Sequence, residues 1–209
     1  MDFAIAAAWK ILTVLLAVGF QAAPVSADAP LPAFGRDTVL VYRNSNEGSG
    51  AFVVRIAQFV PDRYFEWEEG SVQGTIRIPA KMVNDARTLL NYQLFQAGVD
   101  TRSKNATTLW LSRRVYRALK GGARFKLDLD GVPTAVDVLG PDQMTVEVNR
   151  APRALPVIKT KDEYGAERWF LDLEENALLV NLLVRQYQQK LTSITTDRPN
   201  TLRWIREKK

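Results

Sequence analysis

The order of apolar and polar residues predicts short strands through most of the chain. In residues 72–78, Ile76 and Ile78 alternate with Thr75 and Arg77, which is typical of a strand with one buried and one solvated face. β-Branched and aromatic residues dominate the other predicted strands, and turn residues separate them. These strands are 38–44, 51–60, 63–69, 124–129, 134–139, 144–149, 155–161, 168–173, 177–184 and 186–196. The predicted turns include Asp130-Gly131, Gly140-Pro141-Asp142 and Tyr164-Gly165.

Two helices are predicted between these strands. Pro79 suits a helix start, and apolar residues at helical spacing up to Gly98 predict a helix over residues 80–98, with a break near Asn91 as an alternative. Its apolar face consists of Val83, Ala86, Leu90, Leu94 and Ala97. Ser112 fits an N-cap and Gly121 a C-terminus, which predicts a second helix in between. Its inward face consists of Val115, Tyr116 and Leu119.

Roughly ten strands with two helices between them predict an α+β fold that is mainly β. We expect a large curved antiparallel sheet, or half-barrel, with two helices packed on one face. Such layers tend to leave an apolar groove between sheet and helices. The candidate groove residues are Phe65, Trp67, Leu90, Leu94, Phe95 and Trp110.

The N-terminus carries the pattern of a secretory signal. Lys10 precedes an apolar run, Ile11 to Phe20, and Val25 and Ala27 suit a cleavage site after Ala27. The alternative is an uncleaved anchor. We therefore expect a signal peptide at 1–27, a linker at 28–36, one β-rich domain at 37–196 and a basic tail at 197–209. Export to a bacterial periplasm or cell envelope follows, and the tail either contacts an anionic membrane or stays solvated.

The composition narrows the chemistry. With 46% hydrophobic and 24% charged residues, the chain suits a globular domain, and its formal net charge is +5. It contains no cysteine and no histidine, which excludes thiolate nucleophiles, Ser-His-Asp triads and His-ligated metals. We expect no cofactor, no metal and no catalytic residue.

Three acidic stretches are the remaining catalytic or metal candidates. Asp172, Glu174 and Glu175 suit a solvated turn, with a carboxylate site as the alternative. Residues 126–137 place Asp128, Asp130, Gly131 and Asp137 as in a calcium loop, but Lys126 occupies the first ligand position. Glu66, Glu68 and Glu69 flank Trp67, and a solvated strand face explains them, with a sugar-cleaving site as the alternative because such sites combine acids and aromatics.

The second helix has a basic face opposite its apolar stripe. This face suits either solvent or an anionic lipid or acidic partner, and we expect no nucleic-acid contact in an exported protein. The residues of the face are Arg113, Arg114, Arg117 and Lys120.

The export signal together with residues 52–81, 109–120 and 169–180 resembles bacterial exported proteins of unknown function. These in turn are similar to the curved half-barrel of periplasmic lipoprotein carriers. In that family an Asp-rich stretch is followed by an Asn-Pro-Leu turn; Asn176 and Leu178 match it, whereas Leu173 and Ala177 depart from it. The resemblance implies the half-barrel and no established activity.

Three functions compete on these grounds. The leading hypothesis is a non-enzymatic envelope protein that binds an apolar ligand, such as a lipid or acyl chain, between sheet and helices. The second is an envelope accessory or scaffold protein that acts through protein–protein contacts, and the third is a carboxylate-based hydrolase.

Overall fold

The computed structural model describes residues 31–36, 38–45, 50–122 and 124–197. The predicted signal peptide and the predicted tail beyond Asp197 lie outside the described residues.

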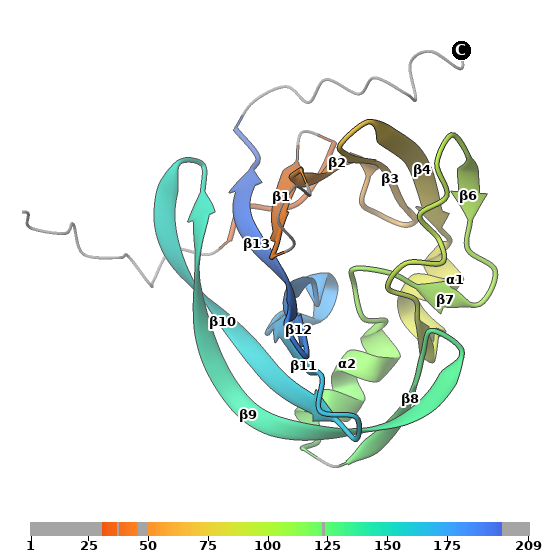
Figure 1. The fold of residues 1–209 in the computed structure, drawn as a ribbon, viewed down its shortest axis with the longest axis vertical. Helices are drawn as coiled ribbons and strands as arrows, with labels where there is room; N and C mark the ends of the chain where they lie inside the picture. Colours follow the sequence, from red (N-terminus) through yellow and green to blue (C-terminus); the bar gives the residue numbers. More distant parts are fainter. Residues whose placement is uncertain (1–30, 37, 46–49, 123, 198–209) are drawn as a thin grey trace, which may run out of the picture.

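The described strands join in one large curved sheet (Figure 1). Its order is β6-β4-β3-β2-β1-β13-β12-β11-β10-β9-β8-β5-β7, and β9 also pairs with β13. The strands are β1 Val39–Asn44, β2 Phe52–Gln58, β3 Arg63–Glu69, β4 Val72–Ile78, β5 Thr88–Leu89, β6 Asp100–Arg102, β7 Ala106–Thr107, β8 Phe125–Leu129, β9 Val132–Val148, β10 Ala151–Asp162, β11 Glu167–Leu171, β12 Leu179–Val184 and β13 Tyr187–Thr195. The helices are α1 Ala80–Asp85, α2 Arg113–Lys120 and the 3-10 turn η1 Glu174–Asn176.

Most strand pairs are antiparallel, and the short strands β5, β6 and β7 add parallel pairs. The outermost strands, β6 and β7, are neighbours in the chain, so the sheet curves until its two ends almost meet. Ser103 holds them together, since its hydroxyl donates to the Ala106 carbonyl at 2.6 Å. The predicted mainly β fold with a curved sheet is therefore confirmed; the sheet does not close into a barrel.

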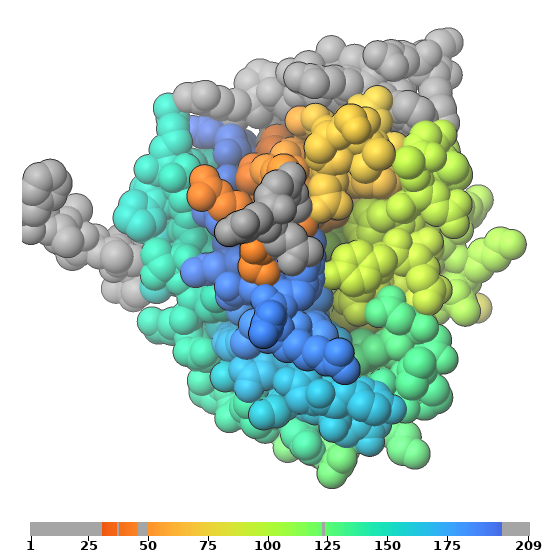
Figure 2. Space-filling model, in the orientation of Figure 1, coloured from red at the N-terminus to blue at the C-terminus, as the bar shows by residue number. Residues whose placement is uncertain are grey.

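Side chains fill the ring that the ribbon outlines, as Figure 2 shows. One apolar cluster is rich in aromatic rings, and we call these rings the aromatic cluster. Its members are Phe52, Phe59, Phe65, Trp67, Phe95 and Trp110. A second cluster, the helix-side cluster, joins α2 to strands β8–β12. Its members include Leu119, Leu127, Leu129, Val136, Ile158, Phe170 and Leu182.

The second helix forms as predicted. The Ser112 hydroxyl accepts a hydrogen bond from the Val115 amide at 3.2 Å, and Gly121 ends the helix. Val115, Tyr116 and Leu119 are buried. The N-cap and the apolar stripe were sufficient signals here.

The first predicted helix, 80–98, is wrong in its length. Helix α1 ends at Asp85, and Thr88 and Leu89 form strand β5 between β7 and β8. The Ala86 carbonyl accepts a 2.6 Å hydrogen bond from the Ser112 hydroxyl. Pairing with the sheet therefore overrides the helical spacing of Leu90 and Leu94.

The predicted turn at Gly140-Pro141-Asp142 is also wrong. Strand β9 runs through it without a break, and the register with β10 shifts beside Gly140, whose φ is 118°. Glycine adopts this conformation readily, so it forms a bulge where a turn was expected. The chain reverses instead at Asn149 and Arg150, with φ values of 50° and 70°. The other two predicted turns are present, with positive φ at Gly131 and Gly165.

Candidate functional site

The six predicted groove residues meet inside the aromatic cluster or against it. Phe65 and Trp110 are fully buried, with ring centroids 5.5 Å apart, and Trp67 meets Phe95 edge-on at 5.4 Å. Leu94 is buried, and Leu90 and Phe95 pack on the same core. Together these side chains fill the core.

A small cavity borders this cluster at Phe52 and Phe95. Its volume is about 40 Å³. Binding sites for organic ligands typically measure ~300–1,000 Å³. Polar side chains line part of it. Asn44 Nδ2 donates to Glu69 Oε1 at 2.6 Å, and Asn44 Oδ1 is buried without a hydrogen-bond partner among the described residues. The cavity suits ordered water rather than an acyl chain.

A larger hollow opens at the end of the helix-side cluster. Its volume is about 460 Å³, and we call it the tyrosine hollow. Four large apolar side chains at its rim are exposed to solvent: Tyr92 by 54%, Val132 by 49%, Tyr164 by 74% and Val184 by 36%. Leu129 and Leu182, which belong to the helix-side cluster, continue its lining. Apolar surface therefore runs from the core into an open depression.

Charged groups in the tyrosine hollow are bound internally. Arg168 Nη1 lies 2.8 Å from Asp162 Oδ2, and both side chains are almost completely buried. The other Asp162 oxygen accepts from the amides of Tyr164 and Ala166. Asp130 accepts two bonds from Asn91, at 2.7 and 2.6 Å. These carboxylates shape the loops around the hollow.

Two tyrosines stand beside each other at this end of the molecule. The rings of Tyr92 and Tyr187 are 6.4 Å apart. Partial burial is the main cause that raises the pKa of both hydroxyls; the neighbouring Tyr187 raises the pKa of Tyr92 further, and the charges of Asp130 and Glu69 add to this. Both phenols stay neutral at physiological pH.

No family model, curated protein or solved structure matches this chain. The resemblance to lipoprotein carriers stays a prediction. In the part of the chain that the structure describes, no helix has the length and apolarity to span a bilayer.

The predicted basic face of α2 and the predicted acidic turn contact each other. Arg117 Nη2 lies 2.6 Å from Glu174 Oε1, and Lys120 Nζ lies 3.1 Å from Asp172 Oδ2. Arg113 pairs with Glu175 in the same way. Three of the four predicted contacts for an anionic partner thus have carboxylate partners within the chain. Arg114 makes no salt bridge to any described residue.

The remaining acidic candidates are dispersed. Glu66 is buried, Glu68 pairs with Arg55 at 2.8 Å, and Asp172 accepts from Tyr116 and Lys120. In the calcium-like stretch, Asp128 accepts from Thr88 and Asp137 lies 3.5 Å from Arg124. Within the described ranges, no group of three or more acidic side chains is placed to hold a metal ion.

Sequence reasoning missed a buried arginine. Arg63 is 3% exposed, lies 4.7 Å from the Phe59 ring and 5.0 Å from the Trp110 ring, and donates from Nη2 to the Glu175 carbonyl at 2.9 Å. Burial, assisted by the charge of Arg113, lowers its pKa to about 9, so it stays cationic at neutral pH. It links the aromatic cluster to the acidic turn. The sequence did indicate this burial, because Arg63, Phe65 and Trp67 are alternate residues of one strand and therefore point to the same face.

Proposed function

We propose that this protein is a non-enzymatic binding protein of the bacterial cell envelope that holds an apolar ligand, such as an acyl chain, in the tyrosine hollow. The observation that carries the proposal is the gathering of four exposed apolar side chains around one depression. Soluble domains seldom leave such a patch open unless it binds something. The volume of the hollow, about 460 Å³, falls within the range of ligand sites.

The location differs from the groove expected from the sequence. Large rings occupy the space between strands β2–β4 and the segment around Phe95, so a chain-like ligand would have to displace packed aromatic side chains. The tyrosine hollow needs no such displacement. Its wall continues the helix-side cluster through Leu129 and Leu182.

The chemistry of the rim favours an aliphatic or aromatic ligand. Tyr92 and Tyr164 offer ring faces, and Val132 and Val184 offer branched aliphatic surface. The carboxylates of Asp130 and Asp162 already accept hydrogen bonds from within the chain. Burial of apolar surface is therefore the main source of affinity here.

The alternative of a scaffold acting through the basic face of α2 has less support. Arg113, Arg117 and Lys120 are already paired within the molecule, so a partner would compete with existing ion pairs. The dispersed acids give no geometric support to hydrolysis.

Titration with N-phenyl-1-naphthylamine, a neutral apolar fluorophore, tests the proposal. We expect saturable fluorescence enhancement, and at least about a tenfold weaker Kd for the double variant Val132→Asn, Tyr164→Ser. Leu139→Asn is the matched control, since Leu139 lies on the same strand as Val132, is similarly exposed at 51% and does not line the hollow. Absent saturation, or equal weakening by the control, would contradict the proposal.

The proposed localisation in the cell envelope has its own test. Expression of the full chain in a bacterium, followed by intact mass measurement of the envelope fraction, should give a mass reduced by residues 1–27. An unprocessed protein recovered only with the cytosol would contradict it.

A further inference from the structure

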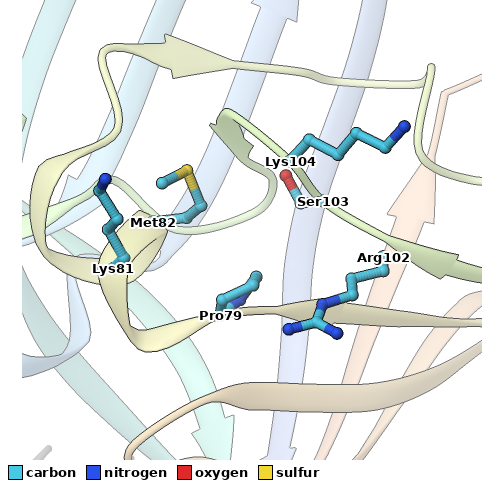
Figure 3. Close-up of a pocket in the computed structure, with 6 residues that line it drawn as sticks. All are labelled: Pro79, Lys81, Met82, Arg102, Ser103 and Lys104. Atoms are coloured by element: carbon cyan, nitrogen blue, oxygen red, sulfur yellow. The ribbon is translucent and has the colours of Figure 1, made fainter.

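A second hollow, on another part of the surface, is lined by cations. Its volume is about 310 Å³, and Figure 3 shows the residues around it. They come from the start of α1 and the residue before it, from the last residue of β6 and from the link between β6 and β7. The lining residues are Pro79, Lys81, Met82, Arg102, Ser103 and Lys104. We call this the basic hollow.

The charge of the basic hollow is unbalanced. Lys81, Arg102 and Lys104 line it, and no Asp or Glu does. None of these three cations forms a salt bridge to a residue that the structure describes, whereas Arg55 and Lys159, for example, each have a carboxylate within 2.8 Å. Three like charges around one depression repel one another unless an anion joins them.

A fourth cation adds to this charge. Arg77 is the register partner of Arg102 in the parallel pair of β4 and β6, and its guanidinium lies 4.5 Å above the Tyr64 ring. Like charges on directly neighbouring strands are destabilising by themselves. The nearby carboxylate of Asp100 accepts a hydrogen bond from Thr75.

The backbone under the cations is held in place. The Ser103 amide donates to the Arg77 carbonyl at 2.9 Å, and its hydroxyl bonds Ala106. On the other side, the Ala80 amide donates to Asp62 at 2.8 Å, which anchors the start of α1 beside Lys81. The side chains thus extend from two fixed backbone segments.

We propose that the basic hollow binds a phosphoryl group attached to an organic moiety. A phosphate has several oxygens that accept charge-assisted hydrogen bonds from Lys and Arg, and its negative charge offsets the repulsion among the three cations around the hollow. Pro79 and Met82 supply apolar surface between the cations, against which the organic part packs. The same chemistry occurs in a phospholipid headgroup and in a soluble phosphate ester. The site is separate from the tyrosine hollow and does not depend on it.

Binding measurements with two probes distinguish a phospholipid headgroup from a soluble phosphate ester. Calorimetric titration with glycerol 3-phosphate tests a soluble ester, and co-sedimentation with vesicles of phosphatidylglycerol and phosphatidylcholine tests a headgroup, both at low salt. Binding of either probe supports the proposal and identifies its source. Failure of both overturns it.

Two triple variants distinguish binding in the basic hollow from a general effect of the net positive charge. The first triple variant is Lys81→Gln, Arg102→Gln, Lys104→Gln. It should weaken binding of whichever probe the parent protein binds by about tenfold or more. The control is the triple variant Arg43→Gln, Arg114→Gln, Lys126→Gln. It removes the same formal charge from exposed positions that make no salt bridge to any described residue. It should change the Kd of the same probe by less than about twofold. All six side chains are exposed, so folding should persist, as thermal unfolding would verify. Equal losses in both triples would overturn the proposal.

Discussion

The Tyr116 hydroxyl donates a 2.7 Å hydrogen bond to Asp172 Oδ1, and this bond joins helix α2 to the acidic turn before β12. The turn and the helix are 52 or more residues apart in sequence, yet Lys120 reaches the same carboxylate. Desolvation of the phenol, together with this bond, raises the pKa of Tyr116. The helix is thus fixed to the sheet by polar contacts as well as by its apolar face.

Removal of this hydroxyl should destabilise the protein. Tyr116→Phe leaves the ring in the helix-side cluster and deletes a hydrogen bond to a charged acceptor, so we expect a loss of about 1.5–3 kcal/mol in the free energy of unfolding. Urea unfolding measures this loss. Tyr164→Phe is the control, because Tyr164 is 74% exposed and its loss should be close to zero. Equal stabilities of the two variants would show that the bond to Asp172 contributes nothing.

The ion pair between Arg117 and Glu174 should show the behaviour of a surface pair. Arg117→Glu places two acids together and should cost up to about 1 kcal/mol at low salt, and the swap Arg117→Glu, Glu174→Arg should recover most of it. Added salt should reduce both effects. The comparison is Arg114→Glu, since Arg114 makes no salt bridge to a described residue. A swap that is no more stable than the single reversal would contradict direct pairing.

The sequence predicts most of the fold because local patterns determine it. Alternation identifies strands such as β3 and β4, and the Ser112 cap defines α2. Two errors have one cause, which is contact between distant segments. Residues 88–89 join a sheet strand although the apolar residues on either side of them have helical spacing, and Gly140 forms a bulge because β10 continues opposite it.

The candidate sites were predicted less well. The basic helix was interpreted as facing solvent or an anionic partner, and the acidic turn as solvated. No local pattern shows that the two contact each other. The rim of the tyrosine hollow comes from the β8–β9 turn, the β10–β11 turn, β12 and the segment around Tyr92. The order of the strands places both hairpin turns and the end of β12 at one edge of the sheet. The sequence predicts the two turns but not this order, so it does not predict that they meet.

Gly74 lies where a side chain would clash. A Cβ at this position would stand 2.8 Å from the Gln96 carbonyl oxygen and 2.8 Å from Trp67 Nε1. Because one neighbour is backbone and the other a buried ring, Gly74→Ala should lower the free energy of unfolding by about 1–3 kcal/mol. Differential scanning calorimetry would record the lower Tm.

Gly35→Ala is the matched control for that substitution. Gly35 has no atom within 4 Å of the added Cβ and no positive φ, so its variant should be neutral or slightly stabilised. If Gly74→Ala unfolds at the same temperature as Gly35→Ala, the close approach of β4 to the Gln96 segment is absent.

Asp142 should make the stability of the protein depend on pH in the acid range. The Trp169 indole N–H donates to Asp142 Oδ2 at 3.0 Å and is the main cause that lowers the pKa of this carboxyl; the Gln143 amide and Lys159 lower it further. A folded-state pKa below the unfolded value means that the unfolded chain binds the proton more readily. The stabilisation is therefore complete above the unfolded pKa, which lies near 4, and is lost as the pH falls through the folded value.

We expect Asp142→Asn to lose stability at pH 7 and to show a shallower decline below about pH 4 than the parent protein. Urea unfolding from pH 2 to 7 measures this, and Trp169→Phe should raise the Asp142 pKa in a carboxyl NMR titration. Parallel stability profiles for the parent and Asp142→Asn, with an unchanged Asp142 pKa in Trp169→Phe, would mean that the indole bond does not form in solution.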